Sequence, residues 1–297
     1  MLPLSQVIHR HKISFHCYAD DTQIYLPLKT DDPSGLDLLK DCLRDIKEWM
    51  SQSFLQLNDT KSEILLFGNS TSVSQIRKNL GSLATLEKPH VKNLGVIFDP
   101  DLKFDKQVKS VVKSCFFQLR TIAKIKSFLS PSDLRRVVLM LIFSRLDYCN
   151  ALYAGVTNKT IHSMQLVQNA AARLVTGAKM REHISPILSS LHWLPVKRRV
   201  KFKIVMFVFK ALNGLAPAYI KDLLDQPTSS RLGRCLRSDN QMTLKVPRSN
   251  LVTRGDRAFS VMAPRLWNKL PLSIKSATTL DSFRARLKTH LFTADDF

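Results

Sequence analysis

The sequence lacks the features of a secreted or membrane-spanning protein. Its longest apolar runs, VVLMLIF at 137–143 and IVMFVF at 204–209, are far shorter than the roughly 20 residues that cross a bilayer. The opening MLPLSQVIHRHK has neither the basic and apolar regions nor the small-residue cleavage site of a signal peptide. We therefore expect a cytoplasmic or nuclear protein that is not secreted and has no membrane partner.

Cysteine is also scarce, and its spacing argues against the usual cysteine-based sites. The chain has 5 cysteines, an odd number, which lie far apart and form no CxxC pair. Neither a disulfide framework nor a zinc knuckle is indicated. Three histidines near the start, His9, His11 and His16, have no second cluster at ligand spacing. We interpret the cysteines as reduced thiols, mostly in the core, and the histidines as ordinary surface or strand residues.

Acidic residues are few beyond the first hundred positions. Residues 1–100 carry 11 Lys and Arg against 12 Asp and Glu, whereas residues 101–297 carry 34 against 12, so the net charge is −1 in the first part and +22 in the second. Such an excess over a folded region suggests a surface for a polyanion, because each neutralised phosphate releases counterions. A general solubility charge is the alternative interpretation.

The first hundred residues have the pattern of an α+β segment. Runs of β-branched and aromatic residues flank Asp20 and Asp21 in SFHCYADDTQIYL, which indicates a β-hairpin. A helix is predicted next, with Asp32 as its cap, Pro33 at its first position and an apolar residue every three or four positions. FLQLN, SEILLF and VKNLGVIFD, the last containing Gly95, are predicted as further short strands.

From residue 101 onward, apolar residues recur with the period of an α-helix. Three successive helices are predicted first, with Ser130 capping the second and Gly177 ending the third. A further helix is predicted between Pro195 and Gly214, followed by an exposed loop at QPTSSRLGRCLRSDN and a last helix over about 279–291.

These patterns predict an α+β fold with three domains. They are an α+β part at 1–100, a helical part at 101–180 and a basic, mainly helical part at 181–297. The helix after Pro195 begins with a basic cluster, Lys197, Arg198, Arg199, Lys201 and Lys203. Since helix N-termini favour acidic residues, this cluster suits a phosphate-binding face, and a solvated helix face fits it equally well.

The adjacent carboxylates of Asp20 and Asp21, at the tip of the predicted hairpin, are unusual because two negative charges lie side by side. Like charges a few Å apart raise at least one pKa unless a cation relieves them, and Mg²⁺ prefers oxygen ligands. Asp-Asp also lacks the glycine that a tight turn with positive φ favours. Asp20 and Asp21 are therefore candidate metal ligands for two-metal phosphoryl or nucleotidyl transfer. A solvated acidic turn explains the same residues equally well.

Several stretches of the sequence resemble one known family. The YADD of HCYADDTQIYL resembles the metal-binding hairpin of reverse transcriptases, and the stretch is similar to LINE-type, non-LTR retrotransposon polymerases. LQLNDTKSEILLF resembles the next palm motif, and KNLGVIFD resembles the primer grip. SRLDYCNALYAG, QLVQNAAARLVTG, LHWLPVKRRVKFK and APRLWNKLP are similar to the region encoded beyond the palm. The resemblance covers nearly the whole chain.

The resemblance implies a partial reverse transcriptase palm, then a helical thumb and a C-terminal region. It implies that Asp20 and Asp21 are catalytic acids that bind Mg²⁺, and that Lys61 lies near the incoming triphosphate as a proton donor or charge stabiliser. The expected partners are an RNA template, a DNA primer and deoxynucleoside triphosphates. The oligomeric state is not indicated.

Candidate nucleic-acid-binding residues lie in all three parts of the chain. The resemblance implies Tyr18, Lys92, Leu94 and Gly95 and the cationic faces of the thumb helices, which include Lys109 and Lys113, and the basic cluster described above adds Lys197, Arg198 and Arg199. Tyr18 would lie beside the primer terminus, although an ordinary strand aromatic is the alternative. Residues 92–96 would position the primer 3′ end, and the thumb helices would grip the template–primer backbone.

One departure from the family pattern affects the expected activity. In the family, a strand with another metal-binding aspartate and the nucleotide-binding fingers precede the hairpin, whereas 17 residues precede Tyr18 here. We therefore expect a fragment of an RNA-directed DNA polymerase of a retrotransposon, impaired in synthesis because catalysis needs a complete preorganised site. The alternatives are a non-catalytic nucleic-acid-binding protein and an inert retroelement remnant.

Overall fold

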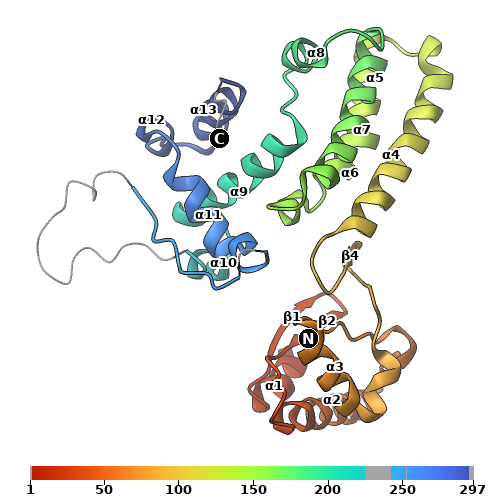
Figure 1. The fold of residues 1–297 in the computed structure, drawn as a ribbon, viewed down its shortest axis with the longest axis vertical. Helices are drawn as coiled ribbons and strands as arrows, with labels where there is room; N and C mark the ends of the chain where they lie inside the picture. Colours follow the sequence, from red (N-terminus) through yellow and green to blue (C-terminus); the bar gives the residue numbers. More distant parts are fainter. Residues whose placement is uncertain (1, 225–241, 252, 294–297) are drawn as a thin grey trace, which may run out of the picture. The chain divides into compact units, whose positions relative to one another are not determined.

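The structure, a computed structural model, describes residues 2–224, 242–251 and 253–293 (Figure 1). The chain divides into two compact units, Met1–Leu102 and Lys103–Phe297, which are described separately. The structure is mostly helical with small antiparallel hairpins, so the predicted α+β fold class is confirmed. Among the described helices, none is both long and apolar enough to cross a membrane.

The first unit contains three α-helices and two hairpins among its described residues. The elements are α1 (Leu2–Arg10), β1 (Ser14–Tyr18), β2 (Asp21–Tyr25), α2 (Ser34–Gln52), α3 (Ser70–Asn79), β3 (Val91–Asn93) and β4 (Val96–Phe98), with 3₁₀ turns at Asp59–Lys61 and Gly81–Leu86. α1 and α2 pack together, and one face of the β1–β2 hairpin covers their apolar cluster of Leu4, Val7, Ile8, Ile13, Cys42 and Ile46. This packing fixes which hairpin face remains in solvent.

α2 begins one residue later than predicted. Pro33 is the N-cap residue by backbone position, and Asp32 Oδ1 accepts a 2.9 Å hydrogen bond from the Ser34 N–H. The Asp32 carboxylate therefore satisfies one of the free N–H groups of the first turn. Hydrogen bonding from the Ser34 side chain, and next from its backbone N–H, lowers the pKa of Asp32. The predicted cap residue does act at the helix start, one position before the N-cap.

Two strand predictions in the first unit are wrong. FLQLN, at 54–58, forms no strand, and SEILLF contributes a single bridge from Ile64 to Glu87. The Asn58 side chain instead accepts from the Thr60 N–H and caps a 3₁₀ turn. Capping by asparagine offers the backbone an alternative to strand pairing, which explains the error.

The predicted single strand VKNLGVIFD is a hairpin. β3 and β4 pair antiparallel with Asn93 opposite Val96, so Leu94 and Gly95 form a two-residue loop. Their φ angles are 45° and 82°. Positive φ at both central positions is the pattern of a type I′ turn, whose twist matches the strands. Leucine at the first position conceals this turn in the sequence, because asparagine or glycine is usual there.

A bidentate ion pair connects α3 with the segment before β3, and we expect it to depend on pH. Arg77 Nε donates to both carboxylate oxygens of Glu87, at 2.9 and 2.8 Å. These hydrogen bonds lower the pKa of Glu87 below its ordinary value of 4.5. A lowered folded-state pKa means that the pair stabilises the unit above pH 4.5 and that this stability is lost as pH falls through the folded pKa.

Glu87→Gln should therefore destabilise the first unit at pH 7, and the difference from wild type should shrink as the pH is lowered. Urea unfolding monitored by circular dichroism over a pH series measures this. Glu63→Gln, at an exposed glutamate of the same unit, is the control. A difference that stays constant down to low pH would contradict the assignment.

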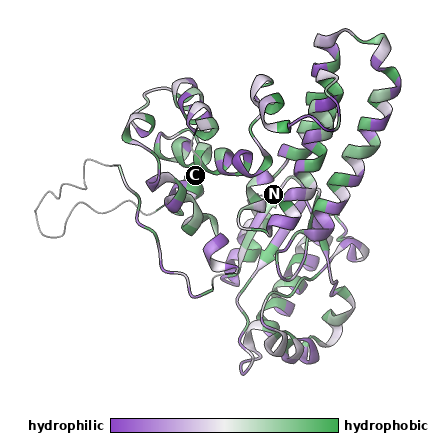
Figure 2. Ribbon diagram, turned by 45° about the horizontal axis from the view of Figure 1, so that its top comes forward, coloured by the Kyte–Doolittle hydropathy of each residue, from purple (hydrophilic) through white to green (hydrophobic). Residues whose placement is uncertain are grey.

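The described part of the second unit is mainly helical and contains no strand. They are α4 (Asp105–Ile125), α5 (Pro131–Val138), a π-helical turn (Leu139–Phe143), α6 (Ser144–Asp147), α7 (Asn158–Thr176), α8 (Ile184–Ser190), α9 (Val196–Leu212), α10 (Ala218–Asp222), α11 (Phe259–Asn268), α12 (Leu272–Lys275) and α13 (Leu280–Thr293). Hydrophobic and hydrophilic residues alternate around these helices, as expected for helices that bury one face (Figure 2). α4 packs on α7, and α9 packs against α11 and α13.

Helix ends in the second unit agree with the cap signals. Ser130 Oγ accepts from the Asp133 N–H at 3.1 Å, with Pro131 at the first helical position. Gly177 ends α7 with a φ of 74°, a conformation that glycine adopts without strain. The predicted final helix is α13. The predicted exposed loop QPTSSRLGRCLRSDN lies outside the described residues.

Candidate metal and nucleic-acid site

The β1–β2 hairpin places its two aspartates differently. Tyr18 pairs with Asp21, so Ala19 and Asp20 form the two-residue loop and Asp21 is the first residue of β2. The positive φ of 53° falls on Ala19. The loop strain therefore lies on the alanine, and the direction of the Asp21 side chain is set by the strand.

One face of this hairpin is available to a ligand. Strand alternation puts Tyr18, Asp21, His16, Gln23 and Tyr25 on a common face, and all five are exposed. On the opposite face, Phe15 and Ile24 pack onto the apolar cluster of α1 and α2. Because the face with Phe15 and Ile24 is packed against α1 and α2, the face with Tyr18 and Asp21 is exposed to solvent.

An aromatic pair stabilises the exposed face away from the tip. The rings of His16 and Tyr25 stack with centroids 5.3 Å apart, and their Nε2 and hydroxyl lie 3.1 Å apart. Tyr18, at the tip, is 70% exposed. Its ring is thus accessible beside Asp21.

The chemistry of the two carboxylates fits a hard cation. Asp20 and Asp21 are exposed and make no hydrogen bond or ion pair with residues that the structure describes. No group of three or more histidine, cysteine, aspartate or glutamate side chains able to hold a metal occurs in that part of the chain. Mg²⁺ is usually held by one or two carboxylates together with waters and substrate phosphates. Two free carboxylates therefore fit such an ion.

The β3–β4 hairpin is connected to the exposed face of the first hairpin. Asn93 Nδ2 donates to Gln23 Oε1 at 2.9 Å, 70 positions away in the sequence. Gln23 lies two residues after Asp21 on the same strand face. Lys92, Leu94 and Gly95 are exposed at and beside the β3–β4 turn. The structure thus brings the predicted primer-positioning segment against the face that carries Tyr18 and Asp21.

Lys61 lies in the same unit but is not joined to the aspartates. It ends the 3₁₀ turn Asp59–Lys61, and its side chain is exposed. No hydrogen bond or ion pair connects it with Asp20 or Asp21 in the described part of the chain. Asp59 of that turn pairs with Lys47 at 2.8 Å.

In the second unit, Lys109 and Lys113 are exposed on α4. They lie opposite its buried residues, which include Val108, Cys115 and Leu119. Burial raises the pKa of the Cys115 thiol to about 11. Cys42 and Cys115 are buried as predicted, whereas Cys17 and Cys149 are exposed, so the prediction of mostly core thiols holds for two of the four described cysteines. Three further exposed cations of α4, discussed below, were not singled out from the sequence. The available signal was helical spacing, since Lys106 lies three residues before Lys109, Arg120 seven residues after Lys113 and Lys124 four residues after Arg120.

The basic start of α9 is partly engaged in internal contacts. Arg198 Nη1 donates to the Phe292 carbonyl at 3.1 Å. Arg199 Nε donates to Asp147 Oδ1 at 2.8 Å, and its guanidinium lies 4.7 Å from the Phe143 ring centroid. Both arginines therefore help to hold α9 against its neighbours.

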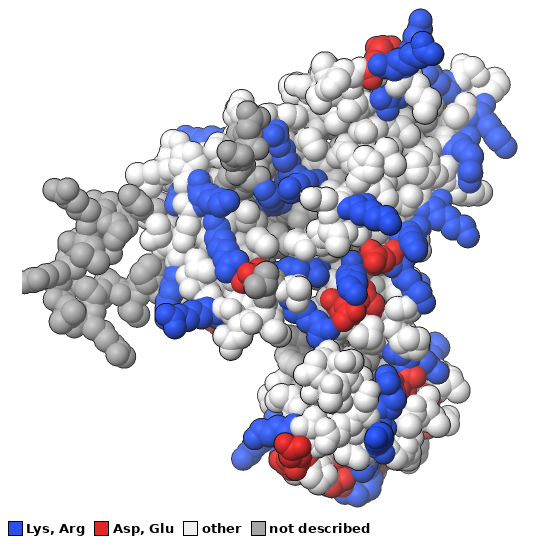
Figure 3. All heavy atoms as spheres, viewed as in Figure 1, with Lys and Arg blue, Asp and Glu red and all other residues white. Residues whose placement is uncertain are grey.

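Lysines near this point experience the surrounding positive charge. Lys197 is exposed. Burial lowers the pKa of Lys201, and the nearby charges of Lys197, Lys269 and Arg198 lower it further. Figure 3 shows lysine and arginine side chains over much of the visible face of the second unit.

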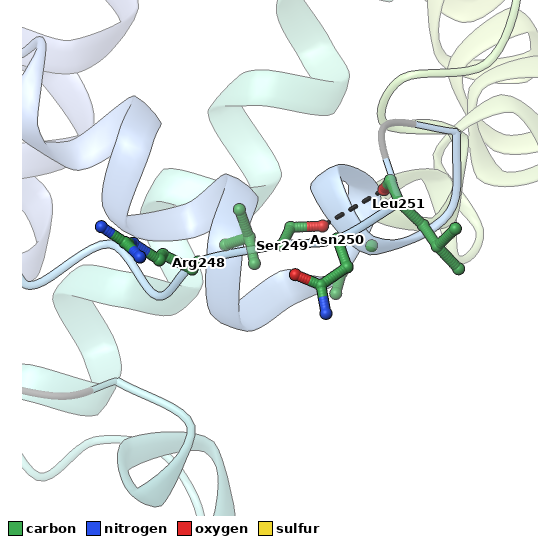
Figure 4. Close-up of a pocket in the computed structure, with 7 residues that line it drawn as sticks. Arg248, Ser249, Asn250 and Leu251 are labelled. Carbon is green, nitrogen blue, oxygen red and sulfur yellow. Dashed lines mark hydrogen bonds between the residues drawn. The ribbon is translucent and has the colours of Figure 1, made fainter.

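A shallow hollow elsewhere in the second unit offers no reactive group. It has a volume of about 290 Å³ and is lined by residues that include Arg248, Ser249, Asn250 and Leu251 (Figure 4). Ser249 Oγ donates to the Leu251 carbonyl at 3.1 Å, which occupies its hydroxyl proton. We assign no function to this hollow.

Comparison with known proteins agrees with the geometry of the first unit. No curated protein and no solved structure matches the chain. One family model does match, over residues 1–98, a range that includes both hairpins and both aspartates. Residues 1–98 of the chain form a domain of the reverse transcriptase (RNA-dependent DNA polymerase) family.

Proposed function

We propose that the first unit carries the metal-binding part of a LINE-type retrotransposon reverse transcriptase, with RNA-directed DNA synthesis as its chemistry. One observation carries the proposal. Asp21 and Tyr18 share an exposed strand face, and the Asn93 hydrogen bond to Gln23 joins that face to the β3–β4 turn, where Lys92, Leu94 and Gly95 are exposed. Acidic ligands and a turn able to approach a primer end are therefore adjacent.

The reaction joins a primer 3′-hydroxyl to the α-phosphorus of a deoxynucleoside triphosphate and releases pyrophosphate. Asp20 and Asp21 would hold Mg²⁺, which activates the attacking hydroxyl and stabilises charge on the phosphates when bound. The exposed backbone of the Leu94–Gly95 turn positions the primer end. Tyr18 presents its ring to the terminal nucleotide, and Lys61 neutralises triphosphate charge once substrate is bound.

The second unit would hold the nucleic acid. Lys109 and Lys113 of α4 and Lys197 of α9 are exposed cations that can contact phosphates without reading sequence. Sequence-independent contact suits an enzyme that must move along any template. In this proposal α4 to α7 act as the thumb of the polymerase.

Primer extension by the purified chain tests the proposal. With an RNA template, a DNA primer, deoxynucleoside triphosphates and Mg²⁺, we expect slow incorporation that is lost in Asp20→Ala. Slow synthesis is expected because the described residues bring two acids together and no cluster of three. A wild-type chain that incorporates nothing, or incorporation that persists in Asp20→Ala, would contradict the proposal.

Binding without synthesis is the second candidate function. The unpaired cations of α4 favour it, because they would hold a phosphate backbone whether or not the metal site is complete. Affinity that falls steeply with salt, in a chain that shows no incorporation, would identify this function.

A further inference from the structure

The exposed cations of α4 form one continuous stripe. Lys106, Lys109, Lys113, Arg120 and Lys124 are all exposed, and the exposed Phe117 occupies the position between Lys113 and Arg120, so that successive members lie three or four residues apart. At 3.6 residues per turn, these six positions fall within about 80° of the helix circumference and extend over about 27 Å. The buried residues of α4 lie on the opposite side of the helix.

The stripe has no anionic partner in the described structure. None of its five cationic groups makes a hydrogen bond or ion pair with a described residue. The one acid of α4, Asp105, accepts from the Thr160 hydroxyl at 2.9 Å. Arg136, an exposed cation of α5, pairs instead with Asp133 at 3.2 Å. Five cations along one helix face, with no acid beside them, suit a polyanion.

Phe117 distinguishes this stripe from a simple phosphate track. Its side chain is 59% exposed, with Lys113 one turn before it and Arg120 one turn after it. A large exposed ring between cations gains nothing from phosphate contact. It offers a flat apolar face of the kind on which an unpaired base stacks.

We propose that this stripe, from Lys106 to Lys124 with Phe117 at its centre, binds a single-stranded segment of RNA or DNA, with one base stacked on Phe117. The cations follow the backbone of the strand, and the ring holds the base. A duplex would contact the cations as well, but its bases are already stacked on one another and cannot reach Phe117. The inference rests on the nucleic-acid-binding part of the proposed function.

Fluorescence anisotropy with the full chain in EDTA tests this inference independently of synthesis. The probes are labelled 20-nucleotide single strands of RNA and DNA and a 20-base-pair duplex, each over a salt series. Phe117→Ala should weaken single-strand binding about 5- to 100-fold, as expected for one lost base stack. It should change duplex binding by about twofold or less, because no duplex base stacks on the ring.

Two further variants separate stacking from charge. Phe117→Trp should preserve single-strand affinity, because it keeps an aromatic face. Lys109→Gln combined with Lys113→Gln should lower the salt slope by about 1.4 on single strands, or about 0.7 per cation. Phe117→Ala should leave that slope unchanged.

The controls are an exposed phenylalanine of the first unit, Phe54→Ala, and an exposed lysine of α10, Lys221→Gln. The phenylalanine control should not reduce single-strand affinity as Phe117→Ala does, and the lysine control should not reduce it as the Lys109 and Lys113 substitutions do. Equal losses on single strand and duplex in Phe117→Ala would overturn the inference, as would no loss on the single strand. Failure of primer extension would leave it standing, since no metal or nucleotide is present in this assay.

Discussion

Asp21→Asn should remove a divalent-ion site at the tip of the first hairpin and reduce nucleotide incorporation by roughly 10²-fold or more, since it deletes a negative charge that would hold the cation that stabilises the reacting phosphates. The register of the hairpin sets the direction of this carboxylate, and its charge is not neutralised by any described residue. Asparagine keeps the shape and removes the charge. The expected effect is therefore electrostatic.

A metal-binding measurement checks this without relying on synthesis. Mn²⁺ favours the same carboxylate and water ligands as Mg²⁺, and its unpaired electrons broaden nearby NMR signals. Backbone signals of Tyr18, Thr22 and Gln23 should broaden in the wild type and remain sharp in Asp21→Asn. Asp31→Asn, at an exposed acid of the same unit, is the matched control. Broadening centred elsewhere, or unchanged in Asp21→Asn, would contradict the site.

The elements that sequence reasoning located correctly are those specified by local pattern. The alternation around Asp20 gives the hairpin because a strand has a period of two residues. α4 follows from its helical apolar stripe, and the limits of α5 and α7 follow from Ser130 and Gly177, whose cap roles depend on neighbouring backbone groups alone. None of these features requires knowledge of distant contacts.

The elements that were missed depend on unusual backbone or on distant partners. The β3–β4 turn holds Leu94 at positive φ, where sequence signals favour glycine or asparagine. α3 was overlooked although Asn69 caps it by accepting from the Ser72 N–H at 2.7 Å. Such a cap is a readable signal, but polar residues dominate the helix and its apolar stripe is weak.

In the candidate site too, some features follow from local sequence and others depend on contacts between distant residues. The adjacency of Asp20 and Asp21 is visible in the sequence, whereas the Gln23–Asn93 hydrogen bond joins residues 70 positions apart. Arg198 and Arg199 look like phosphate ligands in a basic run, but their partners, Phe292 and Asp147, lie on other elements. Side-chain partners across such separations follow from the fold and not from local pattern.

Phe283→Ala should destabilise the second unit by about 3–5 kcal/mol, the cost of removing a buried phenylalanine and leaving a cavity. Phe283 is fully buried on α13. Its ring stacks on Phe209 of α9 with centroids 4.0 Å apart, and on Trp267 of α11 at 5.9 Å. The three rings join three helices that are separate in the sequence, so the cavity weakens all three contacts. Urea unfolding followed by circular dichroism and tryptophan fluorescence measures the loss.

Two variants distinguish this packing role from a general effect of losing a ring. Phe128→Ala, where the side chain is 86% exposed, should change the free energy of unfolding by about 0.5 kcal/mol or less. Phe283→Leu should cost less than Phe283→Ala, because leucine refills part of the cavity. Since folded domains are stable by only about 5–15 kcal/mol, Phe283→Ala is expected to leave the unit marginally folded at 37 °C. A loss no larger than that of Phe128→Ala would mean that α13 does not pack on α9 and α11 through this ring.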